Sequence, residues 1–94
     1  MGNKMNQKIE SAAGFVAVIT LEFIRNKEKK MKDCIDAVEA NKPMYAIVKK
    51  GTKWAEFEQL PWRQVFFFTD FSTLQSIFIK IKGDLDSFKK VQEF

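Results

Sequence analysis

The pattern of apolar and polar positions is clearest in the first half of the chain, where it follows the period of an α-helix. Four apolar side chains stand at positions i, i+3, i+4 and i+7 and therefore share one helix face. They are Met31, Cys34, Ile35 and Val38. Asn26 precedes them as a candidate N-cap, and Pro43 follows as a helix breaker. We therefore predict a helix over residues 27–41.

The segment before this helix, residues 14–23, fits two interpretations. It is apolar on both alternating faces and rich in β-branched residues, as expected of a central strand. Apolar residues from Met5 to Phe23 are also spaced by four and three, as along a helix. Because Gly14 and the β-branched run disfavour a helix, we predict a strand. The alternative is a helical segment over residues 4–41, packed on a smaller sheet.

Two strand-like runs follow, at residues 45–49 and 53–60, on either side of Lys50 and Gly51. A glycine that accepts a positive φ between two such runs is typical of a β-hairpin. We therefore expect these runs to form antiparallel neighbours in a sheet.

The rest of the chain completes the predicted fold. Residues 63–69 form another strand-like run, and residues 76–82 alternate isoleucine with other side chains, as a strand does. Apolar spacing near the end predicts a short helix at about 85–94. The prediction is an α+β fold with a mostly antiparallel sheet of four or five strands and helices on one face.

Composition limits where such a protein can work. A chain of 94 residues with 46% hydrophobic residues is sufficient for one folded domain, residues 1–94. Cys34 has no partner for an internal disulfide, which favours a reducing, cytoplasmic setting. The longest apolar stretch, residues 12–24, is too short to span a bilayer, so we expect no membrane partner.

Candidate chemistry is sparse. The chain has no histidine and one cysteine, so a zinc site lacks its usual ligands, and no glycine-rich loop is present to bind a phosphate. Glu56 and Glu58 would share one face of a strand, but a solvated face explains them more simply. Cys34 lies on the apolar helix face, where we expect it to be buried and protonated. We predict no catalytic residue, no metal and no cofactor, and hence no enzyme.

Basic residues suggest the first of three candidate surfaces. Four of them crowd the start of the predicted helix, where the helix dipole is already positive, and two more flank the predicted turn. They are Arg25, Lys27, Lys29, Lys30, Lys50 and Lys53. This set could bind an anion or nucleic acid through its phosphates, although a solubilising surface is the simpler interpretation.

The predicted hairpin suggests the second surface. Its outer face would combine aromatic residues with charges of both signs, the composition of protein interfaces. The residues are Tyr45, Lys49, Trp54, Glu56, Trp62 and Arg63. Because the two acidic residues of the hairpin, Glu56 and Glu58, would repel a phosphate backbone, this surface favours a protein partner.

A third surface would come from Phe66, Phe68 and Phe78, which by alternation lie on the sheet face opposite Val65 and Phe67. If helices do not cover this face, a homodimer or a partner must, because an exposed aromatic strand invites aggregation.

These observations predict a small non-enzymatic binding protein that acts stoichiometrically on a protein partner. Lysine supplies 14 of the 16 basic residues, and with ten phenylalanines this composition is typical of AT-rich coding sequences. Such sequences occur in phages and mobile elements, so an accessory or inhibitor protein is the expected role. The alternative is a basic nucleic-acid-binding protein, supported by the net charge of +4.

Overall fold

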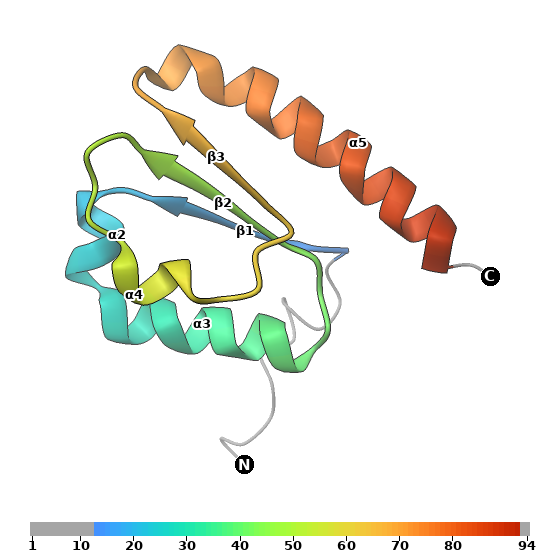
Figure 1. Ribbon diagram of the computed structural model, residues 1–94, viewed down its shortest axis with the longest axis horizontal. Coiled ribbons are helices and arrows are strands. Elements are labelled where there is room, and N and C mark those ends of the chain that lie inside the picture. The colour runs from blue at the N-terminus through green and yellow to red at the C-terminus, as the bar shows by residue number, and fades with distance from the viewer. Residues whose placement is uncertain (1–12, 93–94) are drawn as a thin grey trace.

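A computed structural model describes residues 13–92 of the chain, with side chains described as far as residue 87. The elements in chain order are β1 (Phe15–Ile19), α2 (Leu21–Arg25), α3 (Lys27–Glu39), β2 (Met44–Lys49), α4 (Ala55–Glu58), β3 (Gln64–Phe68), the 3-10 turn η1 (Phe71–Thr73) and α5 (Leu74–Gln92). The three strands form one sheet in the order β1-β2-β3, and both pairings are parallel (Figure 1).

The parallel sheet overturns the predicted antiparallel sheet of four or five strands. Residues 53–60 do not return beside β2 as a hairpin strand; they contain the short helix α4. Gly51 does have a positive φ of 92°, but the turn there leads into a crossover. Parallel neighbours need such a crossover, because the chain must travel back along the sheet before the next strand begins.

The predicted strand at residues 76–82 is also wrong, because this segment lies inside α5. Two of its three alternating isoleucines belong to a helical series: Leu74, Ile77, Ile81 and Leu85 pack towards the sheet on one face of α5, whereas Ile79 is exposed. The helix predicted at about 85–94 therefore begins earlier, at Leu74, and residues 93–94 lie outside the described part.

Other predictions are confirmed. The helix expected at residues 27–41 is α3, and the strand expected within residues 14–23 is β1, so the alternative helical segment over 4–41 is wrong at β1. Residues 4–12 of that alternative lie outside the described part of the chain. The runs at 45–49 and 63–69 form β2 and β3.

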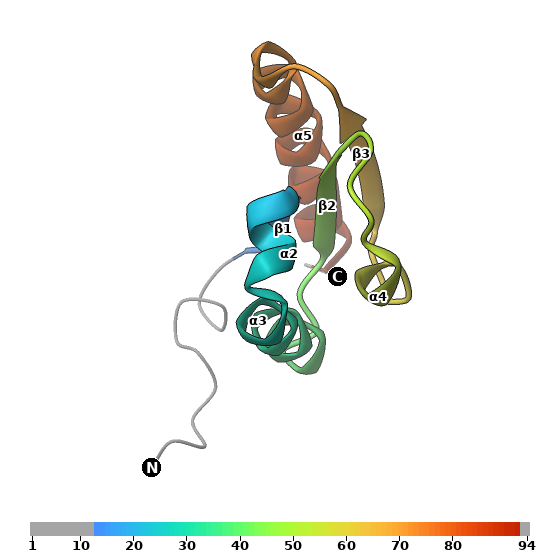
Figure 2. The same cartoon turned by 90° about the vertical axis from the view of Figure 1, so that its left-hand side faces the viewer.

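Helices cover both faces of the sheet, which makes β2 the centre of the fold. Helices α3 and α4 lie on one side and α5 on the other (Figure 2). Along β2, Met44, Ala46 and Val48 face α3 and α4, whereas Tyr45 and Ile47 face α5. All five are buried, which explains why this strand shows no alternation of apolar and polar residues.

Short connections position the helices against β1. The Thr20 hydroxyl accepts a hydrogen bond from the Phe23 amide at 3.4 Å and so begins α2 directly after the strand. Asn26 separates α2 from α3, and the bend there brings Cys34 and Ala37 of α3 onto the core. In the described part of the chain, none of the helices has the length and apolar character needed to cross a membrane.

Cys34 is fully buried in this core, and burial raises the pKa of its thiol to about 12. The expected buried, protonated thiol is therefore confirmed.

Cys34 should react with an aromatic disulfide reagent only when the domain opens. We expect labelling of the folded protein at pH 8 to be slower than labelling in urea by a factor on the order of 100 or more. Stopped-flow absorbance measures both rates. Equal rates in the two conditions would contradict the packing of α3 described above.

Candidate binding surface

The predicted hairpin surface is not assembled, because its residues are distributed over both faces of the sheet. Tyr45 is 0% exposed and faces α5, whereas Trp54 packs in the core on the α3 side. Lys49 lies at the end of β2, with its ammonium 5.4 Å from the Phe71 ring centroid. Glu56 is on α4. The surface as predicted from alternation therefore has no counterpart in this fold.

Tyr45 and Arg63 instead both donate hydrogen bonds to one carboxylate, that of Asp84 on α5. The Tyr45 hydroxyl and the Arg63 Nε both donate to Asp84 Oδ2 at 2.5 Å, and the second Arg63 nitrogen, Nη2, lies 3.3 Å from Oδ1. Tyr45 lies on β2, Arg63 directly precedes β3 and Asp84 lies on α5, so the cluster ties the helix to two strands. Its polar groups satisfy one another, which argues for a structural role.

The electrostatics of this cluster follow from its geometry. The hydrogen bond from Arg63 lowers the pKa of Asp84, and the Tyr45 hydroxyl adds to the effect. Burial raises the pKa of Tyr45 to about 12, and its hydrogen bond to Asp84 acts in the same direction.

Removing the carboxylate should cost more stability than removing the hydroxyl. In the D84A variant the buried Tyr45 hydroxyl loses its acceptor, which costs about 1–3 kcal/mol of unfolding free energy. In Y45F the carboxylate keeps Arg63, so the cost should be about 1 kcal/mol. Urea denaturation measures both. The double variant should be hardly less stable than D84A, and strict additivity would show that the two groups act independently.

The same cluster predicts a loss of stability at high pH. The folded pKa of Tyr45, about 12, lies above its ordinary value of 10.0, so the folded protein retains a proton that the unfolded chain releases. This contribution is complete below pH 10 and is lost as the pH rises towards 12. Unfolding free energies measured from pH 9 to 12 should fall more steeply for the wild type than for Y45F; parallel curves would contradict the assignment.

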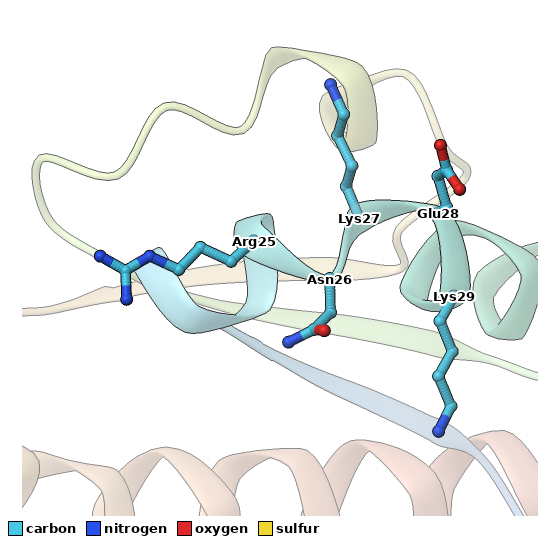
Figure 3. Close-up of a pocket in the computed structure, with 5 residues that line it drawn as sticks. All are labelled: Arg25, Asn26, Lys27, Glu28 and Lys29. Carbon is cyan, nitrogen blue, oxygen red and sulfur yellow. The ribbon is translucent and has the colours of Figure 1, made fainter.

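Part of the predicted anion site does come together. Arg25, Lys27 and Lys29 line a hollow of about 350 Å³ at the junction of α2 and α3, with Asn26 and Glu28. Their side chains fan out in different directions and do not converge on one point (Figure 3). The Lys27 ammonium reaches across to Glu56 on α4, 3.3 Å away. Because both side chains of this ion pair are more than half exposed, the pair contributes little to stability.

The other predicted basic residues lie apart from this hollow. Lys30 places its ammonium over the ring of Phe23, with 5.6 Å to the centroid. Lys53 lines a second, smaller hollow in front of α4 together with Lys27. Lys50 is exposed in the turn after β2. The six basic residues are therefore spread over several places.

An apolar surface whose exposed residues, Val65 and Phe67, were not predicted to bind a partner lies on the outer strand, β3. Val65 and Phe67 face the α3 and α4 side of the sheet, as do the residues of β2 with which they pair, Ala46 and Val48. They nevertheless remain 38% and 58% exposed. Helix α4 cannot cover them, because its four residues span roughly 6 Å.

Two tryptophans adjoin this strand. The Trp54 ring meets the Phe67 ring edge-on, with 6.3 Å between centroids, and lies 6.4 Å from the Trp62 ring. The Trp62 indole nitrogen donates to the Phe57 carbonyl at 2.7 Å, which fixes that ring against α4. We call Val65, Phe67 and Trp62 the β3 patch; Trp54 is only 9% exposed and packs beneath it.

The edge of β3 adds unpaired backbone to this patch. Within residues 13–92, no strand pairs with its outer side. Gln64–Phe68 contains no proline and no charged residue, the features that usually protect edge strands from pairing. The free edge and the exposed side chains are therefore available to the same partner.

The third predicted surface, the sheet face of Phe66 and Phe68, is covered by a helix. Phe66 and Phe68 do lie opposite Val65 and Phe67, but they face α5. Phe68 is buried there, together with Ile77 and Ile81, and Phe78 is partly exposed on α5. The alternation was right for Phe66 and Phe68 but not for Phe78, and because α5 covers the face that they line, that face needs no dimer or partner.

The described residues form no cluster of three side chains suited to a metal ion. Glu56 and Glu58 lie on a helix, where a spacing of two places them on different sides. Comparison of the chain with protein-family models, with curated proteins and with solved structures found no match.

Proposed function

We propose that this protein is a non-enzymatic binding protein whose interface is the β3 edge together with the β3 patch. A partner protein would contribute an extended segment that pairs with β3 as an additional strand. The observation that carries this proposal is an uncharged, unpaired edge strand with a 58% exposed phenylalanine.

The two parts of the surface would have different roles in recognition. In strand addition, backbone hydrogen bonds provide affinity and side-chain contacts provide specificity. Tryptophan and other large aromatic residues contribute most at protein interfaces, because their rings bury area at little entropic cost. Trp54 packs between Phe67 and Trp62, so the aromatic part of the surface is already ordered before a partner binds.

Nucleic-acid binding is the weaker proposal. It is supported by the net charge of +4 and by the hollow formed by Arg25, Lys27 and Lys29. The divergent side chains of that hollow and the ion pair of Lys27 with Glu56 favour a solvated surface.

The setting that we propose is the cytoplasm, where the protein would serve a phage or mobile element as an accessory or inhibitor protein. The support is compositional: one buried cysteine without an internal partner, and a lysine-rich and phenylalanine-rich sequence.

Peptide selection tests the proposed interface directly. Peptides selected from a random display library on the wild type should lose at least about tenfold in affinity for F67K, which places a charge on the edge strand. The control is I79K, because Ile79 is equally accessible, at 65% exposure, but lies on α5. Fluorescence anisotropy measures each affinity.

Two outcomes would contradict the proposal. One is selection of peptides that bind F67K and I79K equally well. The other is failure to select any peptide while a DNA or RNA oligonucleotide binds with an affinity that falls steeply with salt, which would favour the nucleic-acid alternative.

A further inference from the structure

The free edge of β3 is suited to pairing with the same edge of a second copy of the chain. We propose that, without another protein, the β3 edge pairs with β3 of a second copy of this chain, antiparallel and about a two-fold axis at Phe66. The result would be one six-stranded sheet built from the two three-stranded sheets. This inference rests on the proposed function: it uses the same surface and states that a second copy of the chain binds there when no other protein is present.

Full overlap of the five residues of β3 fixes the register of such a pair. Val65 of each copy would lie opposite Phe67 of the other, and Phe66 would lie opposite its own copy. An aromatic residue opposite a β-branched one is a favourable cross-strand pair, and the two-fold axis produces it twice. Both pairs would form on the face of the sheet where Val65 and Phe67 are exposed.

The charges at the two ends of β3 favour this direction. Arg63 precedes the strand and Asp70 follows it. In the antiparallel register Arg63 of one copy lies opposite Thr69 of the other, one residue from Asp70, at both ends, whereas parallel pairing in register brings like charges together. Asp84 neutralises part of the Arg63 charge, but the Arg63 side chain remains 41% exposed.

A two-fold interface also accounts for how the edge is protected. Because the same surface is used by both copies, the interaction closes at a dimer and does not continue into a filament through β3. A foreign strand and the second copy would then compete for one edge, so partner binding should release monomers.

Sedimentation equilibrium tests the dimer. We expect the wild type to reach twice the 11.0 kDa mass of one chain, and I79K to behave in the same way. F67K should dissociate, with a dimer dissociation constant at least about tenfold higher. A wild type that stays monomeric up to about 1 mM, or an F67K dimer as tight as that of the wild type, would overturn the proposal.

Disulfide formation tests the register. Mixing V65C with F67C should give a cross-linked dimer, because those positions face each other, whereas neither variant alone should cross-link efficiently. Cys34 does not interfere, because it is fully buried. Efficient cross-linking of V65C with itself would overturn the register.

The two proposals fail in distinguishable ways. A monomeric wild type that binds F67K-sensitive peptides would leave the proposed function intact and remove only the dimer. If F67K weakens the dimer but the library yields no peptide that binds the wild type, the proposed foreign partner is contradicted and the dimer remains.

Discussion

Burial of β2 on both faces is the constraint on which the rest of this structure depends. Its five apolar residues are enclosed between α5 on one side and α3 and α4 on the other, and β1 and β3 flank it as parallel neighbours. Each connection then crosses the sheet and contributes a helix. The hydrogen bonds from Tyr45 and Arg63 to Asp84 add a polar contact that holds α5 against the strands it covers.

The two crossovers are unequal, and this inequality produces the candidate interface. The first contains α2 and α3, and it covers β1 and β2 well. The second contains only the four residues of α4 between long loops, so Phe57 reaches the core while Phe67 is left in contact with Trp54 and solvent. The exposed side chains of β3 therefore follow from the shortness of α4 and from the position of β3 at the edge of the sheet.

Local pattern was sufficient for β1, α3, β2 and β3 but not for the direction of the strands. The helical spacing of Met31 to Val38 and the β-branched run of β1 each report on short-range geometry, and both predictions are confirmed. Whether β3 runs parallel to β2 depends on the path between them, which local alternation does not encode. Two signals pointed to a crossover: residues 50–63 are long enough for one, and the continuous apolar run of β2 is typical of a strand covered on both faces.

The candidate site could be predicted only in part, for a related reason. Alternation correctly separates Val65 and Phe67 from Phe66 and Phe68, because neighbouring side chains in a strand point to opposite faces. It cannot say which face a helix will cover, and that depends on α5, whose spacing of Ile77 and Ile81 resembles a strand over short distances. Once α5 is recognised as a helix on the Phe68 side, the bare face must be that of Phe67, and Trp54 and Trp62 become its neighbours. Two aromatic residues expected in the hairpin surface, Trp54 and Trp62, therefore adjoin the surface that we propose, but the strand beside them is β3 and not a hairpin.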